Sequence, residues 1–247
     1  MGNKKNIMKK IKTALISVSD KSNLKPLLQI LKREKIKLIS SGGTFKSIKK
    51  LKFKCLEVSD FTGFNEILGG RVKTLHPKIH AGILNQRNNK SHMRQIKNNK
   101  FENIDLVIVN FYPFEKTLEK TKNRSEIIGK IDIGGPTMVR AAAKNYNDVT
   151  VITSTKQYSE LIDQLKTNRG STSLSFRQKM SQLAFEETAY YDSIISNYLN
   201  SNSQLHFPQK KIFHGNLIEK LRYGENPHQE GAIYSQSKKL KINKLHG

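Results

Sequence analysis

Short runs of β-branched and aliphatic residues alternate with helix-like segments along this chain, and this alternation constrains the fold more than any other feature. The runs that we predict as strands are 13–18, 36–40, 55–58, 104–110 and 148–153. The segments that we predict as helices are 21–33, 42–51, 125–130, 136–145, 155–167 and 173–199. The run 104–110 (IDLVIVN) has almost no polar interruption, as a strand covered on both faces requires. The sequence therefore predicts an α/β fold, a parallel sheet with flanking helices.

The domain organisation follows from length and local composition. The 247 residues are enough for one substantial core, which we place at 13–199. Residues 1–12 are a lysine-rich extension without the apolar core of a signal peptide, 200–212 form a polar linker, and 213–247 are too short to build a core of their own. No apolar run approaches the length of a membrane span, and the single cysteine, Cys55, sits in an apolar run typical of a core position. We expect a cytoplasmic protein that has no membrane partner.

The charge of the chain is strongly positive, with 44 Lys and Arg against 20 Asp and Glu, a formal net charge of +24. A nucleic-acid-binding protein is one interpretation of such a charge. The lysines are spread through every segment, however, and no known nucleic-acid-binding motif is present. We therefore expect no dedicated nucleic-acid partner, and the charge itself indicates only that an anionic ligand is favoured.

The loops after the first two predicted strands have the composition of a phosphate site. In a parallel sheet, ligands bind at the carboxyl ends of the strands, over helix N-termini. The first loop is Ser17-Val18-Ser19-Asp20-Lys21 and the second is Ser40-Ser41-Gly42-Gly43-Thr44. Each loop alone is equally well explained as an ordinary helix cap or turn. Two such loops on consecutive strands make a phosphate cradle the better hypothesis.

A third candidate segment is Gly69–Gly82, which contains Arg71, Lys73 and Thr74. Arginine can bind phosphate with a planar fork, whereas lysine is a compact charge suited to a developing oxyanion. His76 and His80 have a metal-ligand spacing, but Pro77 between them disfavours a helix, so we expect no metal site.

Two further segments offer groups for proton transfer. Tyr112 follows the most buried predicted strand and is either a core tyrosine or a site residue. Asp132 precedes Ile133-Gly134-Gly135 and is either a helix-start acid or a site carboxylate. The helix that follows carries Arg140 and Lys144.

These segments together resemble a known family. SVSDK, SSGGT, DFTGFNEILGGRVKTLHPKIHAGIL, NFYPF and DIGGPTMVRAAAKN stand in the order and approximate spacing of the bifunctional purine-biosynthesis proteins. Proteins of that family join an inosine monophosphate (IMP) cyclohydrolase to a 5-aminoimidazole-4-carboxamide ribonucleotide (AICAR) transformylase. The resemblance runs from about residue 13 to the C-terminus, and RVKTLHPKIHAGIL is its most specific part.

The resemblance implies a fold, a reaction and a set of site residues. The fold would be like that of methylglyoxal synthase (Rossmann-like), usually in a homodimer, and the reaction would close 5-formamidoimidazole-4-carboxamide ribonucleotide to IMP without a cofactor. Matching positions imply that Lys73 stabilises the oxyanion, and that Tyr112, Asp132 and Lys144 handle protons. The residues implied to hold the ribose phosphate are Ser17, Ser19, Lys21, Ser41, Gly43, Thr44, Arg71 and Thr74. Those implied to border the base are Asn110, Ile133, Gly134 and Gly135.

The segment Leu221–Gln229 (LRYGENPHQ) resembles the opening of the transformylase domain, with Arg222 and Tyr223 as remnants of its substrate site. The family's catalytic Lys-His pair lies further along than this chain extends. The resemblance therefore implies a truncated C-terminal stub without transformylase activity, and 10-formyltetrahydrofolate would serve only the domain that is missing.

Two other interpretations stay open at this point. A lyase like methylglyoxal synthase would share the fold and the phosphate cradle, although it should lack RVKTLHP and NFYPF. A non-enzymatic module that binds anions or nucleic acid rests on the charge alone.

Overall fold

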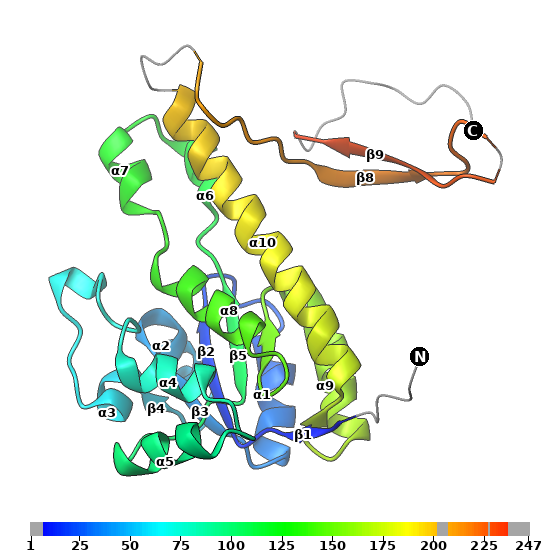
Figure 1. Cartoon of the computed structure of the whole chain (residues 1–247). Helices are drawn as coiled ribbons and strands as arrows, with labels where there is room; N and C mark the ends of the chain where they lie inside the picture. The colour runs from blue at the N-terminus through cyan, green and yellow to red at the C-terminus, as the bar shows by residue number, and fades with distance from the viewer. Residues whose placement is uncertain (1–6, 202–206, 227, 237–247) are drawn as a thin grey trace. The chain divides into compact units, whose positions relative to one another are not determined.

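The fold is described from a computed structural model, which describes residues 7–201, 207–226 and 228–236 (Figure 1). Five parallel strands of the described part form one sheet in the order β4-β3-β2-β5-β6. Their bounds are β2 Thr13–Val18, β3 Lys37–Ser40, β4 Leu56–Glu57, β5 Leu106–Asn110 and β6 Thr150–Ile152. The predicted α/β fold with a parallel sheet is confirmed.

The order of the strands determines where a ligand site can form. The chain moves outward from β2 through β3 to β4, and then returns to the other side of β2 with β5 and β6. The connections therefore diverge between β2 and β5, which pair from Ala14↔Leu106 to Val18↔Asn110. Ligands in open α/β sheets bind at this kind of switch point, beyond the carboxyl ends of the strands.

Helices connect the strands and supply the covering layers. Their bounds are α1 Leu24–Arg33, α2 Gly42–Lys50, α3 Val58–Thr62, α4 Pro77–Leu84, α5 Lys90–Asn98, α6 Phe114–Lys120, α7 Arg124–Gly129, α8 Gly134–Lys144, α9 Tyr158–Thr167 and α10 Leu174–Ser201, with short 3₁₀ turns η1 Leu68–Gly70 and η2 Thr155–Gln157. Helix α8 packs against β5, β6 and α4, and α1 packs against α9. The strands β2 and β5 are almost entirely buried, which explains why their sequences are mostly apolar.

One argument from the sequence was wrong. We took Pro77 as evidence against a helix between His76 and His80, but Pro77 is the first residue of α4. Proline is well tolerated there because the first N–H of a helix has no intrahelical partner. The His76 side chain caps the same helix, with its Nδ1 accepting from the Lys78 N–H at 3.1 Å. The third predicted strand was also too long, since α3 already begins at Val58. No sequence pattern predicted α4, α5 or α6.

A small antiparallel pair of strands lies outside the main sheet. Within the segment assigned to the N-terminal extension, Lys9–Lys10 (β1) pair with Ser171–Thr172 (β7). The side chain of Arg177, only 1% exposed, lies beneath this pair. It donates to the carbonyls of Ile7, Tyr146, Asn147 and Thr172 at 3.1, 2.8, 3.2 and 2.5 Å. One buried guanidinium thus joins three separate segments of the chain.

The described residues form two compact units, divided between Thr188 and Ala189 within α10. The second unit contains the hairpin of β8 Asn216–Leu221 and β9 Gly231–Ser235. Asn216 Nδ2 donates to the Tyr190 hydroxyl at 2.7 Å in this unit. Residues 1–6, part of the predicted linker (202–206) and 237–247 lie outside the described residues. Within the described part of the chain, no helix is both long and apolar enough to cross a membrane.

Candidate active site

Asn110 is the last residue of β5, and its side chain hydrogen-bonds to the loop that follows β2. Its Oδ1 accepts from the N–H groups of Ser19 and Asp20 at 2.7 and 2.9 Å, and its Nδ2 donates to the Asp20 carbonyl at 3.0 Å. All of these bonds are to the backbone of the loop that follows β2. Asn110 was predicted to border a base, and the structure gives it the additional task of holding this loop.

The second predicted loop is held in a similar way. Thr44 Oγ1 accepts from the Val18 N–H at 2.9 Å and donates to the Val18 carbonyl at 3.0 Å. Ser41 is the buried N-cap residue of α2, and its side chain makes no capping hydrogen bond. The Gly43 Cα faces open space, with nothing within 4 Å of a Cβ built there. The start of α2 therefore presents backbone N–H groups next to the end of β2, as an anion site requires.

Lys73 reaches this region from the loop before α4. Its Nζ lies 3.1 Å from the position that a Cβ on Gly42 would take, so the ammonium is next to the first residue of α2. The same ammonium forms an ion pair with the Glu66 carboxylate. Lys73 is therefore placed beside the predicted phosphate loop by the packing of its own loop.

Thr74, which follows Lys73 in the sequence, is in close contact with the start of α8. Thr74 is buried, and its Oγ1 lies 2.6 Å from where a Cβ on Gly134 would be. A Cβ on Gly135 would lie 2.4 Å from Asp132 Oδ2. Side chains at either position would push Thr74 or Asp132 aside, so the two glycines permit the close approach.

Asp132 has the properties of a proton-transfer group. Its Oδ1 accepts from the Gly135 N–H at 2.9 Å, which fixes the carboxyl at the start of α8. Burial raises the pKa of Asp132 above its usual value, and the hydrogen bond from Gly135 opposes this effect only in part. A carboxyl whose pKa lies closer to neutrality is better suited to exchanging protons with a substrate.

The structure thus brings most of the predicted site together at one edge of the sheet. Asn110, Ser19, Thr44, Lys73, Thr74, Asp132, Gly134 and Gly135 are connected by the contacts above. Ser17 is the residue of β2 paired with Val109, while Arg71 is exposed in the loop before Lys73. Tyr112 and Ile133 are 52% and 59% exposed, so both side chains are open to a ligand.

Lys21 is exposed at the end of the first loop, where its Nζ donates to the Ser19 carbonyl at 3.2 Å. It also lines a hollow of about 600 Å³ with Ser47 and Lys50, between the start of α1 and the end of α2. Its position is compatible with a phosphate contact at the edge of the cradle.

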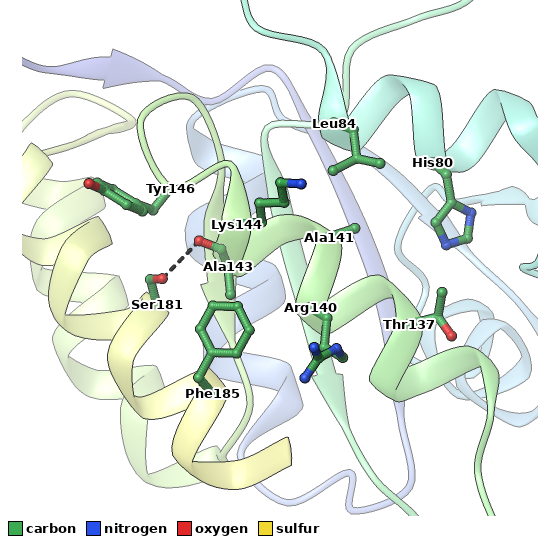
Figure 2. Close-up of a pocket in the computed structure, with 10 residues that line it drawn as sticks. All are labelled: His80, Leu84, Thr137, Arg140, Ala141, Ala143, Lys144, Tyr146, Ser181 and Phe185. Carbon is green, nitrogen blue, oxygen red and sulfur yellow. Dashed lines mark hydrogen bonds between the residues drawn. The ribbon is translucent and has the colours of Figure 1, made fainter. Parts of the chain in front are cut away.

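Lys144 does not join this group. It is at the last position of α8, ten residues after Gly134, which at 1.5 Å per residue amounts to about 15 Å. There it lines a hollow of about 520 Å³ formed by α4, α8 and α10, whose wall runs along α8 from Thr137 to Lys144 and also includes His80 and Phe185 (Figure 2). The Arg140 guanidinium lies 5.5 Å from the centre of the Phe185 ring. Of the four predicted catalytic residues, Lys73 and Asp132 share the contacts described above, Tyr112 follows Asn110 by two residues, and Lys144 lies on the last turn of α8.

The end of α8 is held by donors that the sequence analysis did not identify. Ser181 Oγ donates to the Ala143 carbonyl at 2.8 Å, as the dashed line in Figure 2 marks. Asn145 Nδ2 donates to the carbonyls of Ile83 and Asn85 at 2.8 and 2.9 Å. Ser181 and Arg177 belong to no short motif, and their partners Ala143 and Tyr146 are 38 and 31 residues away in the sequence.

Three further predictions concern metal, thiol and C-terminal residues. Among residues 7–201, 207–226 and 228–236, no group of three or more His, Cys, Asp or Glu side chains could hold a metal ion. Cys55 is half-buried, and burial raises its pKa to about 11, so the thiol is protonated near neutral pH. Arg222 and Tyr223 directly follow β8, with Tyr223 54% exposed.

Comparison with known proteins first defines the class of the domain. Residues 23–137 match the family model described as MGS-like domain, which agrees with the parallel sheet and the loop positions described above. A solved structure titled "Crystal structure of ForH" superposes with a TM-score of 0.69 at 28% identity, covering 76% of this chain and 99% of that one.

The comparisons also identify the family. Residues 142–247 match the model described as AICARFT/IMPCHase bienzyme. Proteins named bifunctional purine biosynthesis protein PurH are 44% identical in Bradyrhizobium diazoefficiens over 92% of this chain, and 48% identical in Persephonella marina over 90%. The chain belongs to this family of bifunctional purine biosynthesis proteins. It spans 43% of the length of each of these two relatives.

Proposed function

We propose that the chain is an IMP cyclohydrolase, which closes 5-formamidoimidazole-4-carboxamide ribonucleotide to IMP with loss of water. The observation that carries the proposal is the cluster at the carboxyl edge of the sheet. Lys73, Thr74, Asp132 and the Gly134-Gly135 pair lie together there, in a chain whose relatives are named purine biosynthesis proteins.

The reaction needs few groups, and the cluster offers them. The carboxamide nitrogen attacks the formyl carbon, so that a C–N bond forms and negative charge develops on the formyl oxygen. The Lys73 ammonium stabilises that charge. The nitrogen gives up its proton to Asp132, whose raised pKa suits it to this exchange. The proton held by Asp132 passes to the oxyanion, which becomes a hydroxyl. The C–O bond then breaks while the formamido nitrogen loses its own proton and forms a C=N bond to the same carbon. The hydroxyl leaves as water by taking a proton from Tyr112, an exposed phenol, which is restored by the proton from the formamido nitrogen.

The remaining residues bind and orient the substrate. The start of α2 would hold the ribose phosphate through its backbone N–H groups and Ser41, and Lys21 would add a positive charge from the loop after β2. Arg71, from the loop before Lys73, adds a bidentate phosphate donor. Bringing amide and formyl group together contributes to the rate in its own right, because it removes the entropic cost of their encounter.

The reaction as written has no change of oxidation state, so we propose that it uses no cofactor. The proposal extends to a homodimer in the cytoplasm, with a purine nucleotide precursor as the small-molecule partner. Transformylase chemistry and its folate belong, in this proposal, to the part of the relatives that this chain does not span.

The test is a direct assay. The purified chain is mixed with 5-formamidoimidazole-4-carboxamide ribonucleotide, and the ultraviolet spectrum is followed for IMP. We expect turnover without added metal or folate, and a loss of about 10²–10³-fold in kcat for Lys73→Ala, the size typical of removing one oxyanion donor.

A matched control is Lys37→Ala, because Lys37 also pairs with a glutamate, Glu102, but begins β3 at the opposite edge of the sheet. It should keep near-normal turnover. No turnover by the folded wild-type chain, or equal losses in the two variants, would refute the proposal.

A further inference from the structure

The loop that carries Lys73 also carries its counter-ion. The N–H and carbonyl of Ile67 pair with those of Val72 at 3.1 and 3.4 Å, in an isolated antiparallel bridge. The residues just outside the bridge are Glu66 and Lys73, so the bridge places them opposite one another. Their side chains form an ion pair.

Two glycines make room for this ion pair. The Lys73 ammonium lies 3.1 Å from a Cβ position on Gly42 and 3.7 Å from one on Gly70. The Gly70 position is also 3.8 Å from Glu66 Oε2. Both glycines have positive φ, +54° and +85°, so their backbone conformations as well as the space favour glycine. The ammonium is thus confined beside the start of α2.

The two partners differ in their exposure to water. The Lys73 side chain is 23% exposed, whereas that of Glu66 is 56% exposed. Ion pairs open to water contribute little net stability, so exchanging one carboxylate for another anion costs little. Glu66 is therefore the partner that can leave, and Lys73 is the one that the fold holds in position.

We propose that Glu66 is a displaceable counter-ion of Lys73. In the free protein it neutralises the ammonium and keeps it beside the phosphate loop, and an incoming anionic ligand takes its place. The inference rests on the proposed function for the identity of that ligand, a nucleotide monophosphate. Glu66 acts only through Lys73, so it is a positioning residue.

The test compares Glu66→Gln with the wild type in calorimetric titrations with IMP and with inorganic phosphate. Removing a competing carboxylate should make the variant bind both anions about 2–5-fold tighter, the range of an exposed ion pair. The gain should shrink in 0.5 M salt, because screening weakens charge effects between exposed groups. A purely structural effect would not depend on salt in this way.

Glu160→Gln is a matched control, since Glu160 also forms an exposed ion pair, with Lys179 on α10. It should bind both anions as the wild type does. Glu66→Asp keeps the charge and should stay within 2-fold of the wild type. Thermal melting of each variant establishes that it is folded.

Kinetics separate the possible outcomes. A lower KM with nearly unchanged kcat supports a displaceable counter-ion. Unchanged or weaker anion binding in Glu66→Gln, or a fall in kcat alone, overturns it. If the wild type makes no IMP, the proposed function fails, and the inorganic phosphate titrations still decide the inference about Glu66.

Discussion

The two ends of helix α8 differ in what they contact. At the first turn, Gly134 and Gly135 lie in close contact with Thr74 and Asp132, and the neighbouring Ile133 is open to solvent. At the last turn, Ser181 and Asn145 hydrogen-bond to backbone carbonyls, and Arg177 does the same for the residues that follow. The first turn of α8 therefore faces the proposed ligand site, whereas its last turn is hydrogen-bonded to the rest of the fold.

The difference shows how one helix can serve both reactivity and stability. The N-terminal end of a helix has free N–H groups and a positive potential, which suit an anionic substrate or a site carboxylate. The C-terminal end has free carbonyls, which side-chain donors can satisfy. Lys144 belongs to the second end, although family resemblance groups it with residues of the first.

The largest expected effect is on turnover, and it tests this division directly. Asp132→Asn should lower kcat by about 10²–10⁴-fold, because a general acid–base group of this kind typically contributes that much. The amide oxygen can still accept from Gly135, so the fold should persist. Lys144→Ala should lower kcat by less than about 5-fold, because Lys144 lies on the last turn of α8, about 15 Å along the helix from Gly134. If steady-state assays show equal losses of kcat for Asp132→Asn and Lys144→Ala, both ends of α8 contribute to one site and the division is wrong.

The next effect concerns stability at the other end. Arg177→Met removes the buried guanidinium that donates to four carbonyls, and we expect it to lower the free energy of unfolding by about 3–4 kcal/mol. Urea denaturation followed by circular dichroism measures this change. Turnover per folded molecule should stay near that of the wild type. A specific loss of kcat without loss of stability would contradict the structural role.

A third prediction, with a smaller effect on kcat, concerns Gly135 at the start of α8. Gly135→Ala places a methyl group where Asp132 Oδ2 now lies, and we expect about a 10–100-fold loss of kcat from misplacing that carboxyl. Gly129→Ala, in α7, meets nothing within 4 Å and should stay within about 2-fold of the wild type. A neutral Gly135→Ala would mean that the position of Asp132 is not critical.

The smallest effect is a pH dependence of stability. Burial raises the pKa of Asp132 in the folded chain, so the folded state holds this proton more tightly than the unfolded state does. Ionisation therefore costs stability as the pH rises from the usual carboxyl range through the raised value. Asp132→Asn should be more stable than the wild type at neutral pH, and the difference should disappear in acid. Thermal melting across this pH range checks the sign.

The sequence was sufficient for the parts of the fold that depend on local pattern. The buried strands β2 and β5 were evident from continuous apolar runs, and the loops after β2 and β3 were found because ligands bind at strand ends. Helix α4 was missed because the sequence analysis treated Pro77 as an interruption, whereas at the first helical position it favours a helix.

The parts that the sequence could not predict depend on contacts between distant residues. The two-residue strands β1 and β7 have no periodic pattern and pair across most of the chain. The same is true of Arg177, whose four carbonyl partners come from three separate segments. The position of Lys144 along α8 could have been inferred from the helical rise, but the family motif groups residues by order and not by distance.

The pairing of β1 with β7 has a consequence for how the chain is made. The main sheet can be completed once Ile152 has left the ribosome, but β1 has no partner until Thr172 emerges, 20 residues later. At about 5–20 residues per second, this leaves the N-terminal strand waiting about 1–4 s after the rest of the sheet is available. During synthesis, Lys9 and Lys10 are therefore among the last residues of this unit to find their place, although they are among the first to be translated.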